Sequence, residues 1–213
     1  MTFNRKQLRV YFIAGTQDVK QGSLDGILKE ALEAGITMYQ FREKGSSSLQ
    51  GEEKTAMAVR LRDLCRHYQV PFIVNDDVDL AIEIDADGIH VGQEDAKVQS
   101  FQHLLEDKII GLSVGSFEEY DQSDLTNVDY IGVGPVYETS SKLDASKPGG
   151  IRLIRRMREY DENIPMVAIG GITEENVAPL LKNGADGIAT ISSITHSTDI
   201  EKSVKRYLQY FKN

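Results

Sequence analysis

The sequence contains no tryptophan and has only one cysteine and five prolines among 213 residues. A single cysteine rules out an intramolecular disulfide, and with it the class of small secreted domains that disulfides hold together. Cys65 follows Leu61 and Leu64 in an apolar pattern of helical period. That pattern predicts a small buried core residue on a helix.

Long hydrophobic runs are also missing. No stretch approaches the roughly 20 apolar residues that a membrane-spanning helix needs. The first residues, Met1–Lys6, lack the apolar centre of a secretory signal. The expectation is therefore a cytoplasmic protein with no membrane partner.

Basic residues are outnumbered, since 24 Lys and Arg stand against 33 Asp and Glu, a net charge of −9. An acidic surface disfavours nucleic acid and anionic membranes as partners. Small phosphorylated molecules stay compatible with it, because a few basic side chains in one cleft are enough to bind them. The hydrophobic fraction of 40% and charged fraction of 27% are typical of a folded globular chain.

Short β-type runs alternate with longer segments of helical period along the whole chain. The predicted strands are Val10–Ala14, Thr37–Arg42, Pro71–Val74, Gly88–Val91, Ile109–Leu112, Tyr130–Val133, Met166–Ile169 and Gly187–Thr190. The predicted helices include Leu24–Ala34, Glu52–Tyr68, Glu175–Leu181 and Ile200–Phe211. No linker divides the chain, so residues 1–213 are expected to form one domain.

This alternation predicts the α/β class and, with eight strands, a (β/α)8 TIM barrel. An open doubly wound sheet usually has fewer strands and often carries a G-x-G-x-x-G turn after its first strand. The corresponding segment here, Gly15–Asp18, lacks that turn. In a TIM barrel the chemistry lies at the C-terminal ends of the strands, so the residues that follow each apolar run are the candidates.

The second predicted strand ends in amide and basic side chains. Because side chains alternate along a strand, Gln40, Arg42 and Lys44 share one face. Tyr39 and Phe41 suit the opposite face, under the helices, and this turns the other three toward the barrel axis and mouth. Three donors on one face fit a diphosphate. A solvated edge or an internal ion pair with a nearby carboxylate is an equal alternative from the pattern alone.

Carboxylates follow the next two strands, in Asn75–Asp77 and in Gly92–Asp95. Neighbouring strands of a barrel bring their ends close together. Two aspartates with phosphate oxygens and water are a usual Mg2+ site. Helix N-capping is the better interpretation of either aspartate alone. Their position on adjacent strands favours the metal.

Hydroxyls and glycines follow the later strands. Ser113 comes directly after the fifth run, and the long polar loop Gly134–Ala145 follows the sixth. Its hydroxyls and Lys142 can close over a phosphate, although a solvated loop is the simpler interpretation if it stood alone. Gly170–Gly171 and Ser192–Ser193 follow the last two strands, where these barrels commonly bind phosphate.

No nucleophile with a partner base emerges from the sequence. The histidines show no metal-pair spacing, and structural or surface roles are expected for all four: His67, His90, His103 and His196.

Five blocks, in this order and at these spacings, resemble the thiamine phosphate synthase family. They are Tyr39–Lys44, Val74–Asp77, Asp87–Asp95, Gly132–Tyr137 and Ala168–Thr173. The similarity runs from about Tyr11 to the last strand. The resemblance implies a TIM-barrel transferase of thiamine biosynthesis. Such an enzyme uses Mg2+ to join an aminopyrimidine diphosphate to a thiazole phosphate, releasing pyrophosphate in a dissociative substitution.

The resemblance also implies roles for individual residues. The aminopyrimidine diphosphate would be bound by Gln40, Arg42, Lys44, Asn75, Ser113 and Lys142, with Phe41 and Glu43 included in the same binding segment. The thiazole phosphate would be bound by Thr139, Ser140, Ser141, Gly171, Ile191 and Ser192, and Mg2+ by Asp76 and Asp95. Arg42, Lys44, Ser113 and Lys142 would be the catalytic residues.

The chain departs from the family pattern in the loop after the sixth strand. The family usually reads Thr-x-Thr-Lys, and this chain reads Thr139-Ser140-Ser141-Lys142. Ser141 keeps the hydroxyl, so its contact is expected to survive. The end of the first strand also lacks a Thr-Asp pair seen in many members, which affects no assigned residue.

Three alternatives remain, and the most general is another phosphate-binding isomerase on this fold, since such barrels host many chemistries. A related thiazole tautomerase, an isomerase on the same barrel, has a histidine where this chain has Pro135 and lacks the paired aspartates. A non-catalytic sensor of phosphate ligands would not need every polar group that this chain keeps. The sequence leaves the oligomeric state open, including a homo-oligomer.

Overall fold

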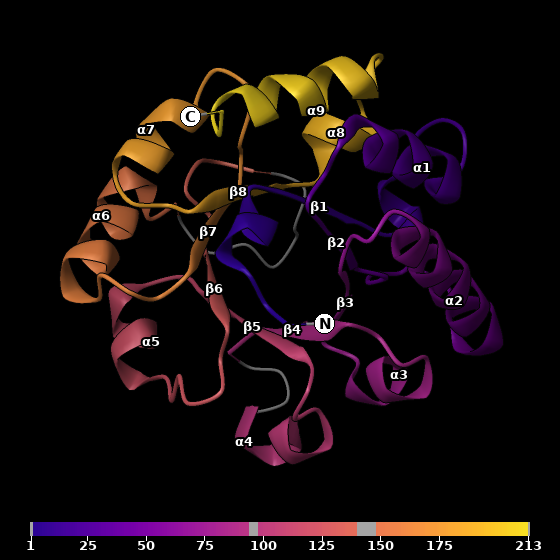
Figure 1. Cartoon of the computed structure of the whole chain (residues 1–213), viewed down its shortest axis with the longest axis horizontal. Helices are drawn as coiled ribbons and strands as arrows, with labels where there is room; N and C mark the ends of the chain where they lie inside the picture. The colour runs from indigo at the N-terminus through magenta and orange to yellow at the C-terminus, as the bar shows by residue number, and fades with distance from the viewer. Residues whose placement is uncertain (1, 94–97, 140–147, 213) are drawn as a thin grey trace.

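The computed structural model describes residues 2–93, 98–139 and 148–212. Its parallel strands form a closed barrel in sequence order from β1 to β8, and β8 pairs with β1 (Figure 1). Helices surround the ring of strands. The predicted (β/α)8 TIM barrel is confirmed.

All the predicted strands are present, several with the predicted bounds. They are β1 (Val10–Ala14), β2 (Met38–Phe41), β3 (Phe72–Asn75), β4 (Gly88–Val91), β5 (Ile109–Val114), β6 (Tyr130–Val133), β7 (Met166–Ile169) and β8 (Gly187–Thr190). Strand β5 is longer than expected because Ser113 and Val114 continue to pair, with Gly132 and Val133 of β6.

The helices of the described residues are α1 (Leu24–Ala34), α2 (Gly51–His67), α3 (Val78–Glu83), α4 (Val98–Phe101), α5 (Phe117–Gln122), α6 (Gly150–Tyr160), α7 (Val177–Lys182), α8 (Ser192–Thr195) and α9 (Ile200–Gln209). Shorter 3₁₀ turns are η1 (Arg5–Leu8), η2 (Thr16–Asp18) and η3 (Gln102–Leu104). None of these described helices has the length and apolar character needed to cross a membrane.

Local sequence explains where several helices begin and end. The Ser23 side chain accepts a hydrogen bond from the Gly26 N–H and starts α1, and Ser116 does the same for α5 with the Glu119 N–H. Gly35 ends α1 with a φ of 103°, a left-handed conformation that glycine adopts without steric cost.

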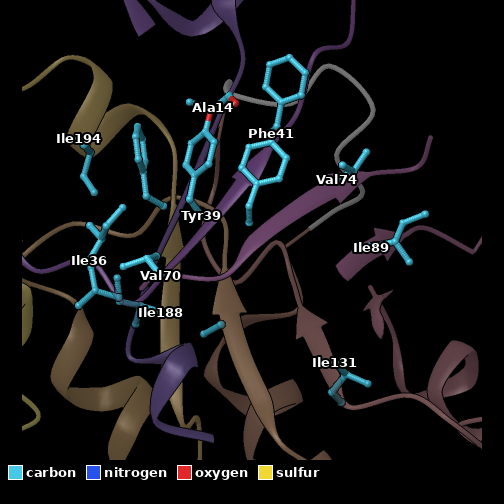
Figure 2. Close-up of a cluster of buried hydrophobic side chains, with 14 of the residues drawn as sticks. Ala14, Ile36, Tyr39, Phe41, Val70, Val74, Ile89, Ile131, Ile188 and Ile194 are labelled. Carbon is cyan, nitrogen blue, oxygen red and sulfur yellow. Dashed lines mark hydrogen bonds between the residues drawn. The ribbon is translucent and has the colours of Figure 1, made fainter. Parts of the chain in front are cut away.

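The core has two layers, one between the strands and the helices and one inside the barrel. Tyr39 and Phe41 of β2 belong to the outer layer, as their alternation predicts (Figure 2). Figure 2 shows the Tyr39 ring directed toward Ala14, whose carbonyl oxygen accepts a hydrogen bond of 2.9 Å from the Tyr39 phenol. The inner layer is formed by Leu8, Tyr11, Ile13, Met38, Ile73, Ile109, Tyr130, Val167, Ala189 and Ile191.

The N-terminal segment closes one end of the barrel. Leu8 of η1 belongs to the inner layer, and the Phe3 ring stacks on Tyr130 with centroids 5.9 Å apart. Gly187 opens β8 against this segment, where a Cβ would lie 1.7 Å from the Leu8 carbonyl oxygen. The mouth at the C-terminal ends of the strands is therefore the end where a site can form.

Candidate functional site

The polar end of β2 points into the barrel. Gln40 is only 1% exposed, and its Nε2 donates to the Tyr11 phenol oxygen at 2.7 Å. The Gln40 Oε1 has no hydrogen-bond partner among the described residues. Arg42, on the same face and nearer the mouth, is 7% exposed. A buried guanidinium needs an anion or a set of acceptors nearby, and the Asp18 carboxylate is one charge with which Arg42 interacts.

Two residues of the same segment turn their side chains away from the mouth. Phe41 lies in the outer core against the Phe72 ring. The Glu43 carboxylate accepts hydrogen bonds from the backbone N–H of Thr16 at 2.8 Å and of Leu49 at 2.7 Å. The Phe41 and Glu43 side chains therefore hold β2 and its following loop in place.

Strand β3 delivers an amide and a carboxylate to the mouth. Asn75 shares the inward face with Ile73, which lies in the inner core. Asp76 follows with a φ of 61°, a left-handed conformation that aspartate tolerates better than most residues. Its carboxylate forms an ion pair with Lys44 Nζ at 2.9 Å. This ion pair is the alternative that the strand pattern left open for the basic face, and the predicted meeting of Asp76 with Asp95 is not tested, because Asp95 lies outside the described residues.

Asp77 has a structural task. Its side chain accepts from the Leu80 N–H to cap α3, and it forms an ion pair with Lys54 at 2.6 Å. Partial burial works to raise the pKa of Asp77, but the hydrogen bonds from Lys54 and Leu80 prevail and lower it. Helix capping was the alternative interpretation of the aspartates that follow β3. It applies to Asp77, and Asp76 remains at the mouth, paired with Lys44.

The donors present fit a magnesium ion in part. Mg2+ is commonly bound through one or two carboxylates together with substrate phosphates and water. Asp76 supplies one such carboxylate, and Asp95 lies outside the described residues. Within the described ranges, no group of three or more His, Cys, Asp or Glu residues forms a metal site by itself. The residues present therefore suit a metal ion that takes its remaining ligands from a bound diphosphate and water.

A second candidate site lies beside β7 and β8. Thr139, Gly171, Ile191 and Ser192 line one pocket, although they come from three separate loops. The pocket includes Ser192, the first residue of α8. Ser140, Ser141 and Lys142 lie outside the described residues.

The glycines of this pocket are required by close packing. Gly171 has a φ of 63°, and a Cβ there would lie 2.4 Å from the Glu138 carbonyl oxygen. Gly170 has a φ of 99°, and a Cβ would lie 2.6 Å from Pro135. Only glycine lets the loops after β6 and β7 approach this closely while the backbone faces the pocket.

Ser113 lies against the buried His90, for which only a structural or surface role was expected. His90 Nε2 is 2.8 Å from the Ser113 hydroxyl, and His90 Nδ1 is 3.2 Å from the Tyr130 phenol oxygen. Tyr130 is in turn 2.8 Å from the Tyr11 phenol oxygen. Strict alternation within β4 places His90 on the inward face, and this is the signal that would have found it.

The comparisons with known proteins agree with this geometry. Residues 10–194 match the family described as thiamine monophosphate synthase. A thiamine-phosphate synthase of Staphylococcus epidermidis is 61% identical over 98% of this chain and 99% of its own length. The Staphylococcus haemolyticus protein of the same name is 57% identical over 99% of this chain and 100% of its own length.

A solved structure supports the same assignment of fold. The thiamine phosphate pyrophosphorylase from Pyrococcus furiosus superposes with a TM-score of 0.85 at 34% sequence identity, covering 97% of this chain and 96% of that one.

Proposed function

The chain belongs to the thiamine monophosphate synthase family and is a transferase of thiamine biosynthesis, and we propose that its barrel mouth joins an aminopyrimidine diphosphate to a thiazole phosphate. The products are thiamine phosphate and pyrophosphate. The observation that carries the proposal is the family match over residues 10–194, which spans both candidate sites of one mouth.

In the reaction, the bond between the pyrimidine methylene carbon and the diphosphate oxygen breaks, and its electron pair leaves with pyrophosphate. The electron-rich aminopyrimidine ring stabilises the resulting carbocation. The lone pair of the thiazole nitrogen then forms the new C–N bond. This route needs no protein nucleophile, so the protein's contribution is positioning and electrostatic stabilisation of the leaving group.

The basic face of the mouth, which carries Arg42 and Lys44, binds the leaving pyrophosphate. Arg42 and Lys44 supply charge from β2, and Asn75 and Ser113 supply neutral hydrogen-bonding groups from β3 and β5. Lys142 is proposed to close over the diphosphate from the loop after β6. Gln40 lies deeper than Arg42 and is nearly fully buried, so its ligand is the pyrimidine ring and not the diphosphate.

Asp76 and Asp95 are proposed to hold Mg2+ together with oxygens of the diphosphate. When bound, the ion neutralises charge that builds on the departing pyrophosphate. Lys44, which pairs with Asp76 at 2.9 Å, orients this carboxylate in the free protein.

The pocket beside β7 and β8 is proposed to hold the phosphate of the thiazole substrate. Thr139, Gly171 and Ser192 line it, and Ser140 and Ser141 would complete it from the same loop as Thr139. The pocket and the basic face are built from different strands of one mouth, so two anionic substrates can bind at the same time.

The test is a discontinuous assay for thiamine phosphate. Purified protein is mixed with the aminopyrimidine diphosphate and the thiazole phosphate, with Mg2+ and with a chelator in its place. Product and pyrophosphate that depend on Mg2+ are expected. Folded protein that binds both substrates and forms no product would overturn the proposal in favour of a sensor or a tautomerase on this barrel.

A further inference from the structure

A chain of hydrogen bonds crosses the barrel interior between two proposed substrate-binding residues. It starts at Gln40, passes through the phenols of Tyr11 and Tyr130 and the ring of His90, and ends at Ser113. The four contacts measure 2.7, 2.8, 3.2 and 2.8 Å. Strands β2, β1, β6, β4 and β5 each contribute one member, so the chain depends on the closed barrel.

Glycines on the inward face make room for the rings. A Cβ at Gly111 would lie 2.3 Å from the Tyr130 ring and 2.5 Å from His90 Nδ1. A Cβ at Gly132 would lie 3.1 Å from His90 Cε1. The His90 and Tyr130 rings stack with centroids 5.5 Å apart. The rings are therefore held in one arrangement, and the partners of the hydrogen bonds between them are fixed.

The direction of the chain follows from the donors available. Gln40 Nε2 can only donate, so the Tyr11 oxygen accepts, and the acceptor for the Tyr11 proton in this chain of contacts is the Tyr130 oxygen. Tyr130 then donates its own proton to His90 Nδ1. An accepting Nδ1 requires the neutral imidazole with its proton on Nε2, which donates to Ser113. Burial raises the pKa of both phenols, so they remain protonated donors.

We propose that Tyr11, Tyr130 and His90 are positioning residues that hold Gln40 as a hydrogen-bond acceptor and Ser113 as a donor toward the substrate. The Gln40 Oε1, without a partner among the described residues, is the acceptor end. The hydroxyl proton of Ser113, left over once its oxygen accepts from His90, is the donor end. This inference rests on the proposed function of the mouth.

The two ends match the chemistry of an aminopyrimidine diphosphate. Its exocyclic amine is a donor that complements the Gln40 oxygen, and its ring nitrogens and diphosphate oxygens are acceptors for Ser113. The same tautomer prevents His90 from taking the Ser113 proton, because the nitrogen nearest the serine is already protonated. The Ser113–His90 contact therefore orients a hydroxyl and does not activate a nucleophile.

The direction is tested by nitrogen NMR of the full chain with ¹⁵N-labelled histidine. The His90 resonances are assigned by their loss in His90→Gln. In the parent protein we expect His90 Nε2 protonated and Nδ1 unprotonated. In Tyr130→Phe, which removes the phenol between Tyr11 and His90, we expect both tautomers to be populated. A parent protein with the proton on Nδ1 would overturn the proposed direction, and an unchanged tautomer in the variant would overturn the role of Tyr130.

Kinetics test the positioning. Tyr130→Phe should raise KM for the aminopyrimidine diphosphate roughly fivefold to tenfold, the size expected for one lost neutral hydrogen bond, and leave KM for the thiazole phosphate unchanged. Tyr11→Phe breaks the same chain and should give the same pattern. Tyr39→Phe is the matched control, since Tyr39 is equally buried but its phenol donates to Ala14 in the outer core. Equal changes in both KM values, or in the control, would overturn the positioning role.

The two proposals can fail separately. If the parent forms no thiamine phosphate, the proposed function fails and the NMR result still decides the direction of the chain. In that case calorimetric binding of the aminopyrimidine diphosphate replaces KM, and an unchanged affinity in Tyr130→Phe would overturn the positioning role.

Discussion

Two lysine–aspartate pairs lie close together in sequence and carry different tasks. Lys44 and Asp76 meet at 2.9 Å, and Lys54 and Asp77 meet at 2.6 Å. Lys44 is 45% exposed at the barrel mouth, whereas Lys54 is 20% exposed and belongs to α2. The first pair joins two strand ends where substrates are proposed to bind. The second joins a helix to the cap of its neighbour.

Replacing each lysine by alanine should separate the two tasks. Lys44→Ala removes a preorganised cation from the diphosphate, so kcat should fall on the order of 10²-fold with little change in stability. Lys54→Ala should leave kcat unchanged and lower the free energy of unfolding by up to about 1 kcal/mol. Steady-state rates and urea unfolding of both variants provide the measurement. Equal loss of kcat in the two variants would remove Lys44 from its proposed role.

Alanine substitutions at Gly171 and Gly22 distinguish the effect of backbone strain from the effect of a steric clash. Both have positive φ, but a Cβ at Gly22 would meet nothing within 4 Å whereas one at Gly171 would lie 2.4 Å from the Glu138 carbonyl oxygen. Gly22→Ala should cost about 1 kcal/mol of stability with unchanged kinetics. Gly171→Ala should also raise KM for the thiazole phosphate at least about tenfold, because the pocket wall must move. Unchanged KM in Gly171→Ala would exclude this wall from the phosphate site.

At the scale of the element, the start of α3 couples stability to pH. The folded-state pKa of Asp77 is lowered from its ordinary value of 3.8. Its charge therefore stabilises the fold above that value, and the stabilisation is lost as the pH falls through the lower folded-state pKa.

Asp77→Asn should keep the helix cap and lose the charge. At pH 6 it should be less stable than the parent by about 1 kcal/mol, and the difference should be smaller at pH 3, because the ionised Asp77 stabilises the fold less as the pH falls below its ordinary pKa of 3.8. Asp77→Ala should lose about 1 kcal/mol more at both pH values because the cap is gone as well. Urea unfolding at the two pH values checks both expectations. A difference for Asp77→Asn that stays constant with pH would contradict the ion pair as its source.

The elements were largely predictable because a strand of four or five apolar residues between helical segments has few other interpretations. The exceptions have specific causes. Helix α7 begins at Val177 and not at Glu175, because the Asn176 side chain bonds to the Gly171 carbonyl oxygen and the Thr173 N–H. Asn176 therefore belongs to the turn that shapes the pocket beside β7 and β8. The hydrophobic periodicity of the helix does not reveal such a contact with a loop.

At the scale of the whole molecule, the candidate site was predictable where it depends on strand ends. Alternation placed Gln40 and Arg42 inside the barrel, whereas the pairing of Asp76 with Lys44 was only one of the alternatives that the pattern left open. The contact of His90 with Tyr130 was not predictable. It depends on ring sizes and on glycines of neighbouring strands that leave space for the rings, and no local spacing encodes that fit.

The barrel separates stability from chemistry, since the layer of helices carries much of the core while the mouth carries the site. Leu28 of α1 is fully buried in the outer core, and α1 packs against α9. Leu28→Ala should lower the free energy of unfolding by about 2–5 kcal/mol and the Tm by roughly 4–20 °C. Well below the new Tm, kcat should match the parent, because Leu28 packs in the outer core under α1 and not at the barrel mouth. Lys29→Ala, at the neighbouring exposed position, should change stability by no more than about 0.5 kcal/mol. A kcat for Leu28→Ala that falls at temperatures where the variant is fully folded would show that the helix layer positions the mouth.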